Sequence, residues 1–331
     1  MTQHSVLGTR YSLLSTRHFL LASLLSFCSE IVLWTNPPSR GILDWLLLAL
    51  GYLALSTLLL EIAHRYRIRD AFGLLLLAGI YGMLNGLILN PQSALIDTPR
   101  TLITRAMGAH ALAGLLALAL FFALSNGLRA RRAHLFALVI TLIVGIGWGT
   151  WARWSPPVFD SLPESAPETL LLYAGAGIAL GALALFAVRR SAPAANARLN
   201  PRGWAFTLLV LVGLTVLHLL RGEIDGLSLS VIVTLSAFSI MILWFHKRKK
   251  GSTLLDGLVN NVFNWTAFVL LVIGFAVGGI AGYGLPRGEG NNDPIALLGA
   301  LFTAYGLIWL PAVSLVLGAR AFSRQARGMK L

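Results

Sequence analysis

Residues 254–284 read LLDGLVNNVFNWTAFVLLVIGFAVGGIAGYG, a long apolar run with three asparagines in its first third. No charged residue occurs after Asp256 in this run. About 20 apolar residues in a helix, rising about 1.5 Å each, cross the roughly 30 Å hydrocarbon core of a bilayer. The run therefore predicts a transmembrane helix, and its asparagines need an explanation because hydrocarbon cannot hydrogen-bond their amides.

The composition of the whole chain indicates that lipid is its main solvent. Of 331 residues, 56% are hydrophobic and 12% are charged, whereas roughly a quarter of the residues of a soluble domain are charged. The net charge of +13 does not predict nucleic-acid binding, because the basic residues form short clusters between apolar runs and no continuous basic stripe. The single cysteine, Cys28, excludes a disulfide within the chain and a thiolate metal site.

Ten segments are long and apolar enough to span a membrane. Because every backbone group in a bilayer must be paired internally, each is expected to be a helix. The predicted fold is an all-α polytopic helix bundle with spans at approximately 18–35, 42–63, 71–90, 106–128, 133–152, 168–188, 203–220, 227–246, 257–284 and 294–318.

The basic residues orient these spans. With both termini in the cytoplasm, most of the 26 Lys and Arg residues fall on the cytoplasmic side, as the positive-inside rule requires. The outer loops keep Arg40, Arg100, Arg105, Arg153, Arg221 and Arg287. The cytoplasmic clusters predict contact with anionic lipid headgroups, and the arginine-rich composition favours a bacterial inner membrane.

Short loops leave no room for a soluble domain, so the sequence predicts one transmembrane domain over 1–331. Ten spans divide into halves 1–155 and 166–331, which would be inverted repeats of the kind found in transporters. Sequence echoes between the halves are too short to establish the repeat. Small residues spaced by four predict close helix packing: Ala78, Gly82 and Gly86; Gly177 and Gly181; and Gly274, Gly278 and Gly282.

The asparagines of the ninth span, Asn260, Asn261 and Asn264, share a helix face with Asp256. Three interpretations are open. The segment forms an amphipathic approach at the cytoplasmic interface, the amides bond to neighbouring helices, or they line a vestibule open to the cytoplasm.

A second polar group lies near the outer ends of other spans: Glu30, Asn85, His110, His218 and Arg221. Ionisable side chains at membrane depth are functional candidates. Glu30 with Arg221 or His110 would form a substrate or coupling-ion site. His110 with His218 would form a haem or metal site, although two separately satisfied histidines are the favoured explanation. No recognisable catalytic, cofactor or metal motif occurs, so the sequence predicts no cofactor.

Three function classes remain open: a carrier for a small or amphipathic solute, a non-catalytic subunit of a larger membrane complex or homo-oligomer, and a membrane-embedded lipid-modifying enzyme with His110 and Glu30 as its acid–base pair. Small loops, glycine-rich helices and polar residues near both ends of the bundle favour the carrier. The scarcity of deeply buried charge favours the subunit.

Overall fold

The computed structural model describes residues 16–33, 35, 40–126, 131–154, 167–190, 199–246, 252–256, 265–286 and 294–326. Over these ranges the chain is helical and contains no β-strand, which confirms the all-α prediction. The elements in chain order are α1 (Thr16–Ser26), η1 (Phe27–Val32), α2 (Ile42–Arg65), α3 (Ala71–Ile88), α4 (Pro91–Ala94), η3 (Leu102–His110), α5 (Ala111–Asn126), α6 (Arg131–Trp154), α7 (Pro167–Arg190), α8 (Pro201–Leu220), α9 (Gly226–His246), α10 (Trp265–Tyr283) and α11 (Pro294–Ala326).

Seven helices of the described chain are long and apolar enough to cross a membrane: Ile42–Arg65, Ala71–Ile88, Leu102–Ser125, His134–Arg153, Pro201–Leu220, Gly226–Phe245 and Ala296–Arg320. Two shorter apolar helices, Glu168–Leu183 and Phe268–Tyr283, overlap further predicted spans. The first and fourth predicted spans each combine an α-helix with a π-helical turn, η1 and η3. The first part of the ninth, 257–264, lies outside the described residues.

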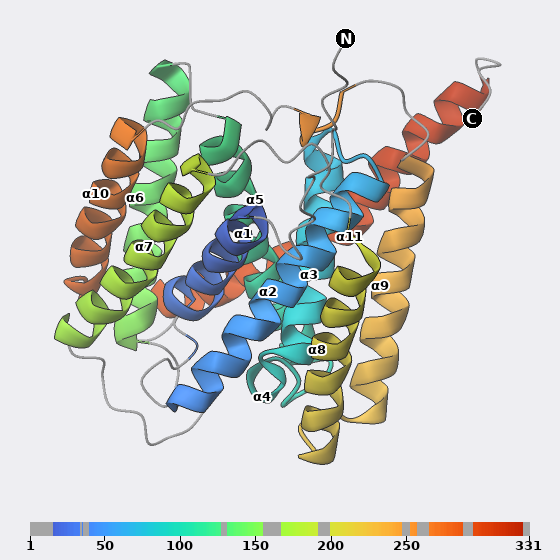
Figure 1. Cartoon of the computed structure of the whole chain (residues 1–331), viewed down its shortest axis with the longest axis horizontal. Coiled ribbons are helices and arrows are strands. Elements are labelled where there is room, and N and C mark those ends of the chain that lie inside the picture. Colours follow the sequence, from blue (N-terminus) through green and yellow to red (C-terminus); the bar gives the residue numbers. More distant parts are fainter. Residues whose placement is uncertain are drawn as a thin grey trace, which may run out of the picture.

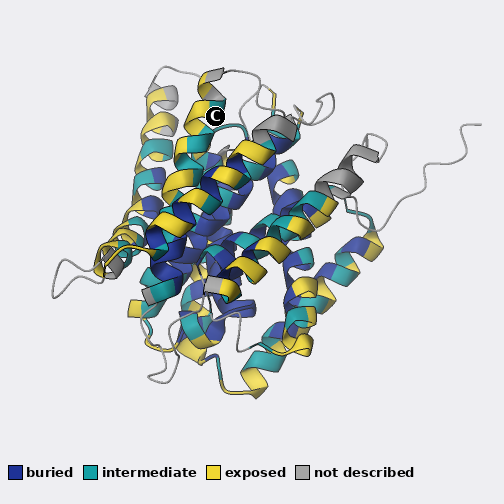
Figure 2. Ribbon diagram, turned by 90° about the vertical axis from the view of Figure 1, so that its left-hand side faces the viewer, coloured by how far each residue is buried: buried dark blue, intermediate teal, exposed yellow. Residues whose placement is uncertain are grey.

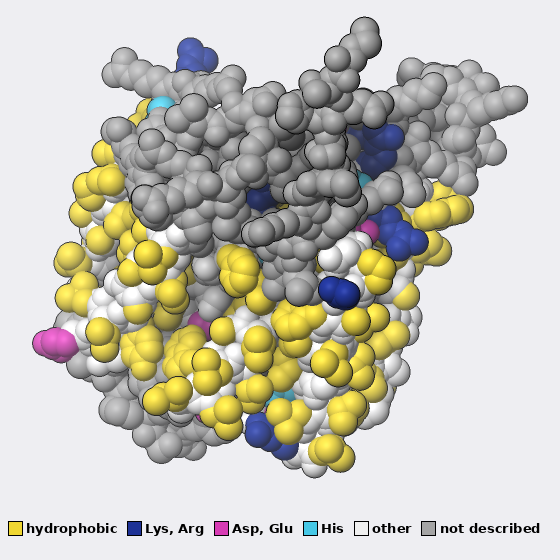
Figure 3. Space-filling view, in the orientation of Figure 1, with side chains coloured by type: hydrophobic (Ala, Val, Ile, Leu, Met, Phe, Trp, Pro, Cys, Tyr) yellow, Lys and Arg dark blue, Asp and Glu magenta, His cyan; other side chains and the backbone are white. Residues whose placement is uncertain are grey.

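The surface of the bundle is apolar. Leu209 is 76% exposed, and Leu172 and Ile280 are each 70% exposed. Hydrophobic side chains form most of the described surface in Figure 3, while the most buried residues gather in the centre of the bundle in Figure 2. A continuous apolar surface suits lipid and not water. Long apolar helices with this surface are those of a multi-pass membrane protein.

Helix α3 lies in the centre of the bundle, and α6, α7 and α10 stand together on one side of it, opposite α8 and α9 (Figure 1). Helix α11 crosses the bundle diagonally and packs mainly on η3. Local sequence explains where two of the helices begin. Asp70 accepts a 3.0 Å hydrogen bond from the Gly73 N–H at the start of α3, and Asn200 accepts one of 2.6 Å from the Gly203 N–H at the start of α8.

The most extensive contact between two described helices is that of α6 with α10. A Cβ added at Gly278 would lie 2.3 Å from the Leu142 carbonyl oxygen, and one at Gly282 would lie 2.1 Å from that of Ile146. A Cβ on Gly274 would lie 2.8 Å from the Leu138 side chain. Glycine here allows the two backbones to touch.

Helix α3 makes a similar approach to η3. A Cβ at Gly82 would lie 2.3 Å from the Ala106 carbonyl oxygen, one at Gly86 would lie 2.8 Å from the Ala106 Cβ, and Ala78 is fully buried. On α7, a Cβ at Gly177 would lie 2.3 Å from the Phe27 ring. Gly181 differs from the sequence expectation, because nothing lies within 4 Å of the position its Cβ would take. It faces open space and does not mark a close helix contact.

Connecting segments meet in two groups. In one group, the Leu254 N–H donates to the Ile68 carbonyl at 2.9 Å, and Arg320 pairs with Asp70 at 3.5 Å. In the other, Thr98 and Ser228 share a hydrogen bond of 2.8 Å. Each group joins segments that the charge pattern assigns to the same side of a membrane. Which side is cytoplasmic stays a prediction.

Candidate functional site

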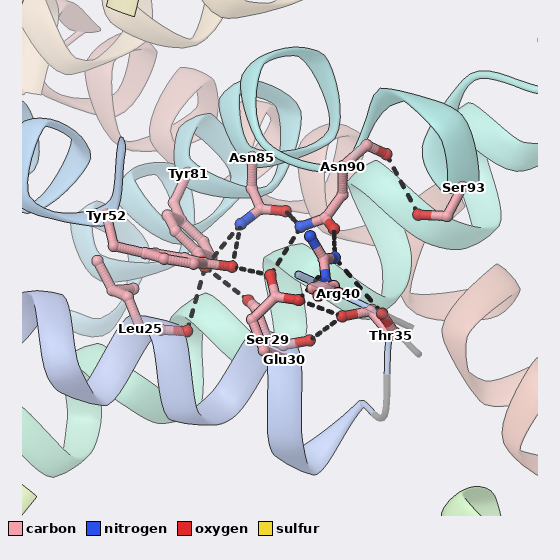
Figure 4. Close-up of polar contacts among 10 residues, drawn as sticks. All are labelled: Leu25, Ser29, Glu30, Thr35, Arg40, Tyr52, Tyr81, Asn85, Asn90 and Ser93. Atoms are coloured by element: carbon pink, nitrogen blue, oxygen red, sulfur yellow. Dashed lines mark hydrogen bonds and ion pairs between the residues drawn. The ribbon is translucent and has the colours of Figure 1, made fainter. Parts of the chain in front are cut away.

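Glu30 lies in the π-helical turn η1 and is fully buried. Its carboxylate accepts hydrogen bonds from the hydroxyls of Tyr52 and Thr35, from Asn90 Nδ2 at 2.9 Å, and pairs with Arg40 Nη2 at 2.9 Å (Figure 4). A buried carboxylate is stable only when paired and fully hydrogen-bonded. These four donors meet that condition.

A second set of hydrogen bonds supports the first. Asn85 Nδ2 donates to the hydroxyls of Tyr52 and Tyr81 at 3.0 Å each, and its Oδ1 accepts from Asn90 Nδ2 at 3.0 Å. The hydroxyls of Ser29 and Tyr81 lie 2.6 Å apart. We call the set Ser29, Glu30, Thr35, Arg40, Tyr52, Tyr81, Asn85 and Asn90 the Glu30 network. It ties η1 to α2, α3 and the segments beside them, so it holds the centre of the bundle together.

Two sequence candidates, Glu30 and Asn85, belong to this network. His110 is buried, and Glu30, Arg105 and Arg40 act on it electrostatically. It makes no hydrogen bond to Glu30, and its Nδ1 has no partner in the described part of the chain. The cation on Glu30 is Arg40, and Arg221 is instead exposed at the end of α8.

His218 belongs to a different place in the fold. Its Nδ1 pairs with Glu223, which also accepts a 2.7 Å hydrogen bond from Gln92. No contact between described residues joins His218 to His110. The described residues also hold no group of three or more His, Cys, Asp or Glu side chains able to bind a metal ion.

The Glu223 contacts predict a pH-dependent contribution to stability. Burial alone would raise the pKa of Glu223, but hydrogen bonds from Gln92 and His218 outweigh burial and lower its pKa. A carboxyl group whose pKa is lower in the folded state stabilises that state above its usual pKa, and this contribution is lost as the pH falls through the folded-state pKa. We expect Glu223→Gln to unfold at a lower temperature than wild type at pH 7, and the difference to disappear at acidic pH. Thermal melts of both proteins across this range measure it, and a difference that persists unchanged in acid would contradict it.

The three asparagines Asn260, Asn261 and Asn264 lie outside the described residues, so all three interpretations of them stay predictions. Asp256 is described. It lies in a turn, where its carboxylate accepts a 2.6 Å hydrogen bond from the Thr253 N–H. That bond lowers the pKa of Asp256, and the carboxylate serves the turn in this structure.

An apolar cavity of about 300 Å³ lies between α1, α5, α6, α7 and α10. Its volume is at the lower end of the range of small-molecule sites, roughly 300–1,000 Å³, and such sites are mostly apolar. Large apolar side chains from all five helices line it, including Leu24, Leu120, Ile140, Ile178 and Leu271. Cys28, the only cysteine of the chain, also faces it.

The π-helical turn η1 separates the cavity from the Glu30 network. Phe27 and Cys28 line the cavity, whereas Ser29 and Glu30 take part in the network. π-Helical turns are rare and often occur at functional sites. Here the turn places the apolar cavity beside the Glu30 network, and Glu30 itself does not line the cavity.

Sequence reasoning missed Arg40, Asn90, Tyr52 and Thr35 as parts of the network. Arg40 precedes a helix and was assigned to an outer loop, and Asn90 was the last residue of the third predicted span. One signal was present: Tyr81 and Asn85 are four residues apart on α3, so their side chains share a helix face. The cavity had no signal in the sequence, because the residues lining it resemble those facing lipid.

Comparison with known proteins adds no further constraint: no protein-family model, curated protein or solved structure matches this chain.

Proposed function

We propose that this protein is a multi-pass carrier for an amphipathic solute in a bacterial plasma membrane. The observation that carries the proposal is the apolar cavity of about 300 Å³ between five helices. In this proposal all ten helical segments cross the membrane, with both termini in the cytoplasm. The grouping of the connecting segments at two ends of the bundle supports this topology.

The helix contacts around the cavity suit a carrier. Helix α10 packs extensively on α6, and α7 and α5 both pack on α1, so the cavity lies between two sets of helices. A change in the distance between the sets would open or close the cavity without breaking the close α6–α10 contact. Rigid-body movement of one helix group against another is the usual basis of alternating access.

The Glu30 network does not favour the third function class, a membrane-embedded lipid-modifying enzyme. A general acid or base must reach the proton that it transfers, but Glu30 is surrounded by its four donors and does not line the cavity. We assign the network the role of fixing η1, one wall of the cavity.

Filling the cavity tests the carrier. Gly181 lines it and has open space where a side chain would begin, so Gly181→Trp places an indole inside without a backbone clash. We expect the initial rate of solute movement to fall at least about tenfold, which corresponds to about 1.4 kcal/mol of activation free energy. Gly175→Trp is the matched control, because Gly175 lies on the same helix, has open space and does not line the cavity.

The measurement uses phosphatidylcholine vesicles containing the purified protein and a fluorescent NBD-labelled lysophosphatidylcholine. Dithionite destroys the label in the outer leaflet, so protein-dependent movement exposes the inner pool as well. Absence of protein-dependent movement, or equal rates for wild type and Gly181→Trp, would contradict the carrier. Binding of the probe without movement would favour a lipid-binding subunit of a larger complex.

A further inference from the structure

Arg105 is a cation without an ionic partner in the described part of the chain. It lies in η3, within the apolar segment Leu102–Ser125, and is partly buried. No described carboxylate pairs with it, and its guanidinium lies 5.5 Å from the centre of the Trp151 ring. A guanidinium carries five N–H donors, and leaving it partly buried without an anion is costly.

The described residues around Arg105 include further donors, and His110, whose Nδ1 has no described partner, offers no carboxylate. The indole N–H groups of Trp148 and Trp151 are buried and have no partner among the described residues, and an indole N–H can only donate. Glu30, the buried carboxylate of η1, is already occupied by Arg40. No carboxylate in the described part of the chain neutralises Arg105, so a bound molecule that satisfies it would carry negative charge.

A series of aromatic rings connects Arg105 to the cavity. Phe27 and Phe275 both line the cavity, and their ring centres are 5.5 Å apart. Phe275 stacks on Trp148 at 4.7 Å. Trp151 follows one turn later on α6, about 4.5 Å along the helix axis, and lies against Arg105. A chain of ring contacts, through side chains that are themselves buried, thus runs from the cavity wall to the guanidinium.

We propose that Arg105 binds the anionic headgroup of the amphipathic solute, a phosphate or carboxylate, while the hydrocarbon chain of that solute occupies the cavity. Guanidinium groups bind both oxyanions through paired N–H donors, and burial strengthens the interaction. The inference rests on the proposed function and adds the charge of the solute to it. It also gives a role to an arginine that has no described carboxylate partner at the start of an apolar segment.

The test uses full-length protein in phosphatidylcholine nanodiscs and two photoactivatable probes, a decyl phosphate and the corresponding decyl alcohol, each with a diazirine near the end of the chain. Mass spectrometry locates the cross-links. We expect both probes to label residues lining the cavity, and the phosphate to bind more tightly. Arg105→Gln should weaken binding of the phosphate probe about 10- to 100-fold and leave the alcohol unchanged. Arg105→Lys, which keeps the charge, should retain part of the preference.

Arg100→Gln is the matched control, because Arg100 is close in sequence and 83% exposed. Unchanged labelling by the alcohol shows that each variant is folded. Equal binding of the two probes to wild type, or no effect of Arg105→Gln, would overturn the headgroup assignment and leave the cavity intact. Competition by inorganic phosphate as strong as that by decyl phosphate would also overturn it, since the site would then bind a free anion. Failure of both probes to label the cavity would instead contradict the proposed function.

Discussion

Replacing Glu30 by alanine is expected to destabilise the protein by about 3–5 kcal/mol, the usual cost of removing one partner from a buried ion pair. The substitution leaves Arg40, Tyr52, Thr35 and Asn90 without their shared acceptor. Arg40 is only 18% exposed, so water replaces the lost carboxylate poorly. Thermal unfolding of the purified protein in detergent, followed by tryptophan fluorescence, measures the change.

A double substitution separates the ion pair from the rest of the network. Glu30→Ala combined with Arg40→Ala removes both charges, so we expect it to cost less than the sum of the two single changes, by about 0.5–3 kcal/mol. The control is Glu168→Ala on the exposed start of α7, where a change within about 0.5 kcal/mol is expected. A Glu30→Ala protein as stable as this control would show that the network does not hold the bundle together.

The helices could be predicted from the sequence because the property that defines them is local. Length and hydropathy of each segment are read directly, and helix is the structure that satisfies the backbone in lipid. The π-helical turns η1 and η3 were not predicted, since an extra residue in a turn leaves no compositional mark. These turns orient Glu30 and Arg105, so the detail most relevant to the site was the least readable.

Depth along the spans identified Glu30 and Asn85 as buried polar residues, but could not identify their partners. Arg40 and Asn90 come from segments outside the long helices, and their position beside Glu30 depends on how those segments fold back. Arg40 was assigned to an outer loop from its place in the sequence, and Asn90 was taken only as the end of the third span. The tertiary fold instead brings both residues beside Glu30. Because this folding back could not be read from the sequence, Arg221 was considered as the partner of Glu30.

Glycine spacing predicted that helices approach closely, and left open which ones pair. Gly278 and Gly282 meet α6, whose own Gly145 and Gly149 are also four residues apart and were not singled out. A Cβ at Gly149 would lie 2.1 Å from the Gly279 carbonyl oxygen. Which helices pack together depends on the fit between two helix surfaces, and the sequence of one segment alone does not show that fit. Gly181 carries the same spacing but faces the cavity.

Replacing Gly278 by leucine is expected to separate α10 from α6 and to destabilise the protein by about 3 kcal/mol, the upper part of the range for overpacking. The added Cβ would lie 2.3 Å from the Leu142 carbonyl oxygen and 3.0 Å from the Ile146 nitrogen. Both are backbone atoms, so no side-chain rotation relieves the clash and the whole helix must move.

Gly278→Leu also affects the cavity, because Phe275 on α10 and Val144 on α6 both line it. Moving α10 away from α6 therefore alters the cavity wall, and we expect slower movement of the lysophosphatidylcholine probe as well as a lower unfolding temperature. Gly213→Leu is the matched control: Gly213 is exposed on α8 with nothing within 4 Å of its Cβ position. That change should leave solute movement intact and slightly stabilise the helix, by about 0.5–1 kcal/mol. Equal stability of the two variants would mean that α6 and α10 do not touch through their backbones.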